Sequence, residues 1–270
     1  IYPALWACLA VSILVVLLSY DINTTFFDAI SWLAAQMTIG QFYNHDFLRG
    51  YGVGTLNGSL WTIPVELQFY LALPIIYWLI KNLKITNVGL GVCIILLATF
   101  NQFFHLDLKN QETVFIKLLG VSLLPHLYMF LFGVFLQRNQ GLVHKILAGK
   151  AFYWLLALVL GNSAFMYFGI TFQGNSINPI SSSILSLLTI SLAYTQTDKL
   201  SKILRGNDIS YGVYIYHMVF ANLLIQTQFT IGPMALVTML FMTLVAATLS
   251  WRLVERPALN RKKSSIHRPS

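Results

Sequence analysis

The sequence predicts an all-α protein, a polytopic transmembrane helical bundle with about eight spans. Hydrophobic residues make up 57% of the chain and charged residues only 10%, and the mean hydropathy is +0.69. Soluble domains carry roughly 25% charged residues, so a chain this apolar would lack the polar groups to cover its surface. The apolar residues also fall into long runs of the length that a helix needs to cross a bilayer.

Eight runs qualify as spans, while one further apolar stretch does not. Residues 24–43 are interrupted by Asp28 and Gln36, so we expect an interfacial or re-entrant segment there. No repeat or soluble insert separates the runs, which predicts one membrane domain over 1–270 with a basic tail at 252–270. The chain begins in an apolar stretch without Met or a leader, so it is predicted to be a fragment. The spans are 4–20, 61–80, 88–104, 118–136, 152–170, 181–197, 209–226 and 233–252.

The basic residues predict the orientation, because short cytoplasmic loops are enriched in Lys and Arg. If residue 1 starts on the cytoplasmic side, 14 of the 17 basic residues face the cytoplasm and only Arg49, Lys109 and Lys117 lie outside. Both ends are then cytoplasmic in a multi-pass protein of a bacterial inner membrane. The 14 residues are Lys81, Lys84, Arg138, Lys145, Lys150, Lys199, Lys202, Arg205, Arg252, Arg256, Arg261, Lys262, Lys263 and Arg268.

The composition argues against two other classes of function. The net charge of +8 comes from clusters between apolar runs rather than from one basic face, so no nucleic-acid partner is predicted. Cys8 and Cys93 both lie inside apolar runs and provide neither a disulfide framework nor metal-ligand spacing. We expect them to be packing residues, and no metal site is predicted.

The first stretch with chemical content is 59–74. Thr62 can cap a helix and Pro64 suits its first turn. Glu66 would then fall in the first turn at the outer end of the span, with Tyr70 at i+4 on the same face. One interpretation is that Glu66 complements the helix dipole. The other is that it marks a functional site, because an ionisable group at membrane depth is costly.

The second stretch is 207–220. Ser210, Tyr214 and His217 follow i, i+4, i+7 spacing and so share one helix face. His217 lies roughly 15 Å from the cytoplasmic start of the span, near the bilayer midplane. The stripe favours a polar cavity, although a lone intramembrane His can also serve as a hydrogen-bonding contact between helices.

The third stretch is 249–261, where the last span reaches the cytoplasmic surface. Glu255 sits between Arg252 and Arg256, and Pro257 follows. By its residues alone this stretch is best read as an interfacial anchor, with Trp251 at the headgroups and a local Glu–Arg pair.

Together these stretches resemble the acyltransferase family 3 signature, in the family's order and over essentially the whole chain. Trp61-Thr62, Glu66, Phe69-Tyr70-Leu71 and Pro74 resemble its signature span, and Ser210-Tyr-Gly-Val-Tyr-Ile-Tyr-His217 resembles its Ser-Tyr-Gly-x-Tyr-Leu-x-His span. Ser250-Trp-Arg-x-Val-Glu255-x-Pro257 resembles its closing motif. Ile1-Tyr2-Pro3 is similar to the residues that follow the family's Arg-x-x-Arg motif.

The resemblance implies a membrane O-acyltransferase with about ten spans in the full-length protein, of which the first two are missing here. Such enzymes move an acyl group, usually acetyl, from acyl-CoA to a hydroxyl of a cell-surface or exported glycan. It implies acyl-CoA (acetyl-CoA) as donor substrate without a bound cofactor, and the lipid bilayer and a glycan or lipid-linked sugar as partners. The family's first-span histidine and the Arg-x-x-Arg motif are not in this chain, so the fragment is expected to lack that histidine as its base.

The resemblance also gives the candidate residues their roles. Glu66 and His217 are the catalytic candidates, with Glu66 near the outer mouth, where the acceptor is expected, and His217 lining the acyl-transfer cavity. Glu255 would lie by the CoA entrance. The alternative function is a multi-pass transporter or flippase of a lipid-linked or small substrate, which would bury similar polar residues. The substrate-binding candidates are Ser210, Tyr214, Trp61, Tyr70, Ser250 and Glu255.

Overall fold

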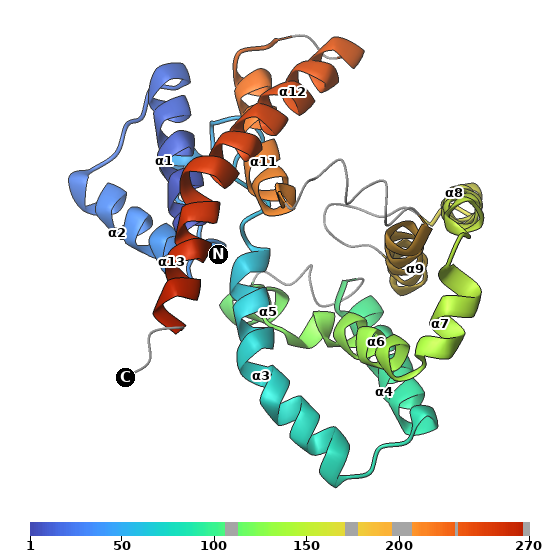
Figure 1. Ribbon diagram of the computed structural model, residues 1–270. Helices are drawn as coiled ribbons and strands as arrows, with labels where there is room; N and C mark the ends of the chain where they lie inside the picture. Colours follow the sequence, from blue (N-terminus) through green and yellow to red (C-terminus); the bar gives the residue numbers. More distant parts are fainter. Residues whose placement is uncertain (106–112, 171–177, 196–206, 230–231, 267–270) are drawn as a thin grey trace. The chain divides into compact units, whose positions relative to one another are not determined.

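The computed structural model describes residues 1–105, 113–170, 178–195, 207–229 and 232–266, and every regular element among them is helical (Figure 1). The all-α prediction is therefore confirmed for the described residues. The chain divides into two compact units. The terminal unit comprises Ile1–Pro64 and Gly206–Ser270, and the central unit comprises Val65–Arg205.

The terminal unit brings the two ends of the sequence together. α11 packs against both α1 and α12, and α1 also contacts η4. A hydrophobic cluster that includes Val16, Trp32 and Leu56 joins α1, α2 and the segment before α3. The elements are α1 (Tyr2–Ser19), α2 (Phe26–Met37), the 3-10 turn η1 (Asp46–Leu48), α11 (Ser210–Gln226), α12 (Pro233–Ser250), the π-helical turn η4 (Trp251–Glu255) and α13 (Arg256–Ile266).

The central unit has two hydrophobic clusters. Ile80, Leu90 and Leu131 join α3, α4 and α6, while Leu136 and Leu147 belong to a cluster that reaches α8 and α9. The elements are α3 (Thr62–Asn82, which begins in the terminal unit), α4 (Asn87–Phe103), α5 (Val114–Gly120), η3 (Leu124–His126), α6 (Leu127–Arg138), α7 (Gln140–Leu147), α8 (Ala151–Tyr167) and α9 (Pro179–Thr195).

Seven of the predicted spans each coincide with one helix, and the span predicted at 118–136 is divided between α5, η3 and α6. The structure does not establish that eight segments cross the membrane. Four segments are long and apolar enough to cross a membrane, or five if α7 and α8, which meet at 81°, form one broken span. α4, α9 and α11 have 17 residues each, or about 25 Å of helix against a hydrocarbon core of about 30 Å. The four segments are Tyr2–Ser19, Thr62–Asn82, Val114–Arg138 and Pro233–Arg261.

Some of the sequence predictions concern residues that the structure does not describe. Most of the predicted cytoplasmic segment 198–208 lies outside the described residues, as do the last two residues of the span predicted at 181–197. Residues 24–43 are described, and they contain only the short helix α2. At 12 residues α2 is too short to cross the bilayer, which fits the predicted non-spanning segment. The basic residues outside the described part are Lys109, Lys199, Lys202, Arg205 and Arg268.

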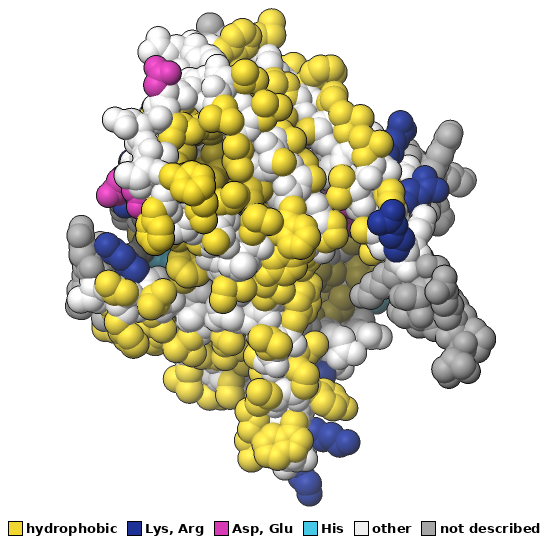
Figure 2. All heavy atoms as spheres, turned by 90° about the vertical axis from the view of Figure 1, so that its left-hand side faces the viewer, with side chains coloured by type: hydrophobic (Ala, Val, Ile, Leu, Met, Phe, Trp, Pro, Cys, Tyr) yellow, Lys and Arg dark blue, Asp and Glu magenta, His cyan; other side chains and the backbone are white. Residues whose placement is uncertain are grey.

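The outer faces of the helices are apolar, as expected of a protein whose solvent is lipid. Leu18 in α1 and Phe26 in α2 are 80% and 82% exposed. Figure 2 shows one face on which hydrophobic side chains predominate, with Lys and Arg side chains at its margins. Apolar patches of this extent are rare on monomeric soluble proteins and mark contact surfaces. Together with the four long apolar helices, this surface supports a membrane protein.

Gly212 allows the close approach of α11 and α12, the most extensive helix pair in the terminal unit. A Cβ atom on Gly212 would lie 2.9 Å from both Cα and Cβ of Ala247. Gly212→Val is expected to destabilise the protein by about 1–3 kcal/mol, because neither helix backbone can move without repacking. Thermal unfolding in detergent measures this, with Gly133→Val as control, since a Cβ at Gly133 meets nothing within 4 Å. Equal midpoints for the two variants would contradict the prediction.

Candidate functional site

The centre of the candidate site is the polar face of α11, where the structure brings Tyr214 and His217 together. His217 Nδ1 lies 2.7 Å from the Tyr214 carbonyl oxygen. The Tyr214 hydroxyl donates to the Ser59 carbonyl oxygen at 2.5 Å and shares a hydrogen bond with the Thr62 hydroxyl. Tyr214 therefore joins α11 to Ser59 and to Thr62, the first residue of α3, within the terminal unit.

The contact with Tyr214 determines which nitrogen of His217 carries the proton. A carbonyl oxygen can only accept a hydrogen bond, so Nδ1 must be the donor. In neutral His217 the lone pair then belongs to Nε2, which forms no hydrogen bond with any described residue. His217 is partly buried. The contact therefore makes Nε2, and not Nδ1, the nitrogen of the neutral ring that can accept a proton, and His is the side chain that general-base catalysis most often uses.

Ser210 does not join this pair. Its side chain is exposed, and its hydroxyl donates to Asp208 Oδ1 at 2.6 Å. The same Asp208 oxygen accepts the Ser210 backbone N–H at 3.1 Å, so Asp208 satisfies a free donor at the start of α11. The predicted three-residue stripe is thus reduced to Tyr214 and His217.

Two buried polar residues at this site, Asn57 and Ser59, were given no role from the sequence, and Cys8 was expected only to pack. Asn57 Nδ2 donates to the Ile215 carbonyl oxygen at 2.7 Å. Ser59 Oγ donates to Asn57 Oδ1 at 2.6 Å, and Cys8 Sγ donates to the Ile215 carbonyl oxygen at 3.2 Å. Asn57, Ser59 and Cys8 are all buried, so this network is shielded from water. It fixes the backbone of α11 next to the Tyr214 carbonyl that orients His217.

Asn222 binds the same segment about two helical turns further along α11 than Ile215. Its Nδ2 donates to the carbonyl oxygens of Thr55 at 2.8 Å and Leu56 at 3.0 Å. Its Oδ1 accepts the Val53 backbone N–H at 3.1 Å. Asn222 is completely buried, and Gly52, with φ +54°, leaves no room for a Cβ beside it. The segment before α3 is therefore part of the core.

We predict that Asn222→Leu loosens this segment. The similar-sized apolar side chain would leave the partners of Asn222 without hydrogen bonds, at a cost of about 1–3 kcal/mol for each buried group. The free energy of unfolding in detergent and protease cleavage within residues 50–60 measure the effect. Asn87→Leu is the control, because its hydrogen bond to Asn139 is exposed. Unchanged stability and cleavage in Asn222→Leu would contradict the prediction.

The closing motif forms a second polar group, around the π-helical turn η4. Ser250 Oγ donates to Glu255 Oε1 at 3.0 Å across this turn, and Trp251 Nε1 donates to Asn207 Oδ1 at 3.0 Å. The predicted Glu255–Arg pair was wrong, since Glu255 forms no salt bridge among the described residues and its partner is Ser250. Single π-helical turns inside α-helices frequently occur at functional sites.

Glu66 and Tyr70 lie in the central unit on α3. The Tyr70 hydroxyl donates to Glu66 Oε1 at 2.5 Å, as their i+4 spacing predicted, and both residues are exposed. The expected cap was wrong: α3 begins at Thr62 itself, so Glu66 is the fifth residue and lies beyond the first turn. Trp61 precedes α3 and is partly buried. Among the described residues no group of His, Cys, Asp or Glu is placed to hold a metal ion.

Comparisons with known proteins point to the same family as the sequence motifs. An acyltransferase domain model of acyltransferase family 3 matches residues 1–252. The chain is 29% identical to Nodulation protein 10 of Rhizobium leguminosarum bv. viciae over 286 residues, which cover 99% of this chain and 75% of that protein. No solved structure matches the chain. Because the family model covers nearly the whole sequence and its motif residues form the contacts described above, the chain belongs to acyltransferase family 3.

Proposed function

We propose that this protein is a membrane-bound O-acyltransferase that moves an acyl group, in the first place acetyl, from acyl-CoA to a hydroxyl of a cell-surface or exported glycan. Membership of the family supports acyl transfer as the reaction type. The observation that carries the assignment to this site is the hydrogen bond from His217 to the Tyr214 carbonyl oxygen, which leaves Nε2 able to accept a proton.

The proposed reaction needs one proton transfer in each direction. In this proposal His217 takes the part of base that the family resemblance gives to an upstream histidine. The acceptor hydroxyl gives its proton to His217 Nε2 while its oxygen attacks the thioester carbonyl carbon of acyl-CoA. The carbon–sulfur bond then breaks, an oxygen ester remains on the glycan, and the imidazolium returns the proton to the CoA thiolate. A positioned base of this kind contributes roughly 10²–10⁴-fold to the rate.

The other predicted residues have supporting roles in this proposal. Tyr214 orients His217, while Trp61 and Ser210 lie at the ends of the segments that form the site. Glu66, with Tyr70, orients the acceptor. We also propose that the protein lies in a bacterial inner membrane with both ends in the cytoplasm, because 14 of its 17 basic residues then face that side.

The proposal is tested with the protein in nanodiscs and acetyl-CoA labelled in the acetyl group. We expect label to appear in an alkali-labile ester on the glycan, with equimolar release of free CoA. The alternative, a transporter or flippase, is not favoured by the family membership. It would show as movement of a lipid-linked sugar across the bilayer without acyl-CoA consumption, and that outcome would overturn the proposal. Succinyl-CoA in place of acetyl-CoA tests the identity of the acyl group.

A further inference from the structure

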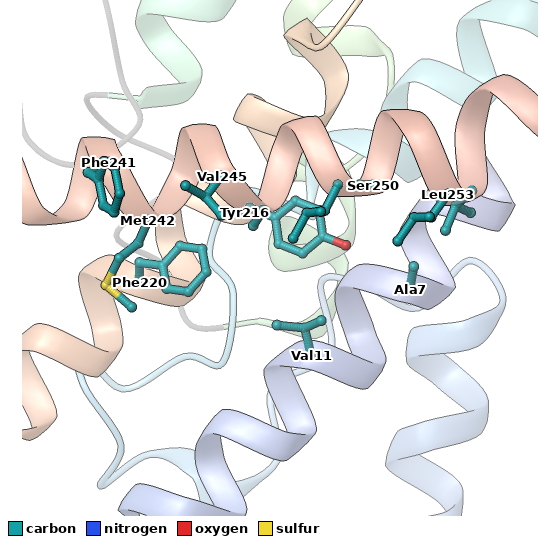
Figure 3. A pocket seen from close by; sticks show the side chains of 12 residues that line it. Ala7, Val11, Tyr216, Phe220, Phe241, Met242, Val245, Ser250 and Leu253 are labelled. Carbon is teal, nitrogen blue, oxygen red and sulfur yellow. The ribbon is translucent and has the colours of Figure 1, made fainter.

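The last helical segment of the chain is longer than a bilayer core requires. α12, η4 and α13 form one segment, Pro233–Arg261, which is 29 residues long and corresponds to about 43 Å of helix. Figure 3 shows Val245 and Leu253 along one unbroken stretch of its ribbon. About 20 residues cover a hydrocarbon core of about 30 Å. If the core begins at the first residue of α12, its other edge lies near Arg252, and the rest of the segment extends beyond it.

Apolar and basic side chains meet at this edge. Leu249 and Leu253 are 52% and 72% exposed, and both line an apolar groove that α12 and η4 form with α1 and α11. Arg252 and Arg256 are exposed as well, and neither forms a salt bridge with a described carboxylate. Two guanidinium groups are therefore available beside apolar side chains that face lipid tails.

Beyond η4 the basic residues are distributed around the helix rather than along one face. At 3.6 residues per turn, positions 256, 261 and 262 fall on three different faces of α13. A helix that lies flat on a membrane carries its basic residues on one face, whereas charges on all faces suit a helix that passes through the headgroup layer. Glu255 is the only acidic residue from position 250 to the end of the sequence, and its carboxylate accepts a hydrogen bond from Ser250.

We propose that this part of the helix is a basic collar that binds anionic phospholipid headgroups of the leaflet through which it passes. The collar has an inner pair near the edge of the hydrocarbon core and an outer trio further along α13. Binding of this kind selects lipids by the charge of their headgroups and requires no acyl transfer, so the inference goes beyond the proposed function. The inner pair is Arg252 and Arg256, and the outer trio is Arg261, Lys262 and Lys263.

The two parts of the collar act at different distances from the lipid phosphates. The headgroup layer extends about 5–8 Å beyond the hydrocarbon core on each side, and the inner pair falls within it, at most about 6 Å past the edge. Guanidinium groups at this depth can bind a phosphate in bidentate geometry. The outer trio begins about 14 Å past the edge, which is beyond bidentate contact but within about one Debye length of the headgroups. Each Lys or Arg near an anionic surface strengthens binding about fivefold.

The surroundings of the inner pair favour a phospholipid over a soluble phosphate compound. A phospholipid carries acyl chains and a phosphate in one molecule, so its chains can cover Leu253 while its phosphate binds Arg252. Inorganic phosphate, or the nucleotide end of CoA, leaves the exposed leucine side chains uncovered. The attraction therefore combines apolar contact with charge, as it does for basic helices at membrane surfaces. The CoA entrance expected near Glu255 is the competing assignment, and the test below distinguishes the two.

The collar is also joined to the start of α11. Trp251 in η4 donates to Asn207 Oδ1 at 3.0 Å. The adjacent Asp208 accepts the backbone N–H of Ser210, the first residue of α11, at 3.1 Å. Because a ligand that binds only the folded protein stabilises it, we expect anionic lipid at the collar to raise the thermal midpoint of the protein.

The inner pair is tested by Arg252→Gln/Arg256→Gln in the full chain, in a neutral detergent at about 20 mM salt. Native mass spectrometry measures the apparent Kd of the first bound phosphatidylglycerol, with phosphatidylcholine as the comparison without net charge. We expect the variant to weaken phosphatidylglycerol binding by at least about fivefold, to leave phosphatidylcholine binding unchanged, and to lose the rise in thermal midpoint. The control is Lys81→Gln/Lys84→Gln, which removes two exposed charges at the end of α3 and should bind like the unmodified protein.

The outer trio is tested by Arg261→Gln/Lys262→Gln/Lys263→Gln in the same assay. Since these residues act through the electrostatic field, the variant should weaken phosphatidylglycerol binding by at least about fivefold at about 20 mM salt. At about 200 mM salt the Debye length is shorter, and the loss should fall below about twofold. The loss in the inner-pair variant should persist at the higher salt, because bidentate contact is screened less.

Three outcomes would overturn the proposal. In the first, the unmodified protein binds phosphatidylcholine as tightly as phosphatidylglycerol, so headgroup charge is not selected. In the second, CoA or inorganic phosphate displaces phosphatidylglycerol at equal concentration, so the arginines hold a soluble phosphate compound. In the third, both collar variants bind phosphatidylglycerol like Lys81→Gln/Lys84→Gln, so the collar is not the site. If the inner-pair variant fails to fold, the outer-trio variant at low salt decides. Absence of acyl transfer would leave these results unchanged, because none of them measures activity.

Discussion

His217→Asn is expected to reduce acetyl transfer by roughly 10²–10⁴-fold, the contribution of a positioned general base. The asparagine amide reaches the position of the imidazole Nδ1 and can keep the hydrogen bond to the Tyr214 carbonyl oxygen, which is 2.7 Å long in the structure. It has no atom in place of Nε2. The variant therefore removes the proton acceptor while it retains the local contact on α11. Acetyl transfer from labelled acetyl-CoA measures the effect.

Two controls make this result specific. The thermal midpoint of His217→Asn should stay close to that of the unmodified protein, since the retained hydrogen bond keeps the packing. His144→Gln, at an exposed position on α7, should transfer acetyl normally. Normal turnover by His217→Asn would mean that His217 serves only as a contact between α11 and its surroundings, and a different base would have to be sought.

Glu66→Gln is expected to abolish acetylation, with a fall of at least about 100-fold from the misplaced acceptor, without loss of protein from the membrane. The amide has the shape of the carboxylate and can still accept a hydrogen bond from Tyr70, but it carries no charge with which to hold the acceptor hydroxyl. Because Glu66 is exposed, folding should not depend on it. Since Glu66 lies beyond the first turn of α3, where the dipole effect fades, the loss would not reflect helix stability.

The companion variants separate charge from contact. Tyr70→Phe removes only the hydroxyl that donates to Glu66, so it should lower activity less than Glu66→Gln does. Asp46→Asn neutralises an exposed carboxylate that pairs with Arg49 in the terminal unit, and it should act like the unmodified protein. Normal acetylation by Glu66→Gln would rule out a catalytic role for Glu66.

Local patterns in the sequence predicted the features that depend on neighbouring residues. Apolar runs located the helices, and the i+3 and i+4 spacings predicted that His217 and Tyr214, and Glu66 and Tyr70, share faces. The number of helices that cross the membrane could not be predicted in the same way. Helices such as α4 and α9 are apolar but shorter than the hydrocarbon core of a bilayer. Their tilt and depth in the membrane depend on the helices beside them rather than on their own composition.

Contacts between distant segments could not be predicted in this way. Asn57 bonds the Ile215 carbonyl oxygen, 158 positions along the chain, and nothing near Asn57 indicates that partner. The Gly-rich composition of residues 50–58 favours an exposed loop. One signal was available, because Asn222 lies inside a predicted span, where an amide needs a partner. The π-helical turn that turns Glu255 towards Ser250 has no sequence rule of this kind.

The burial of the segment before α3 affects how membrane topology can be mapped experimentally. Tyr51, Leu56 and Leu60 are at most 6% exposed, whereas Val53 is 55% exposed. A cysteine introduced at Leu60 would not react with an impermeant thiol reagent, and that result would suggest a position within the bilayer, although Leu60 is simply buried inside the protein. A cysteine at Val53 would react with the same reagent and would report the side of the membrane on which this segment lies. A labelling survey of this protein should therefore choose exposed positions, since a buried position in a connecting segment and a position within the bilayer both fail to react with the reagent.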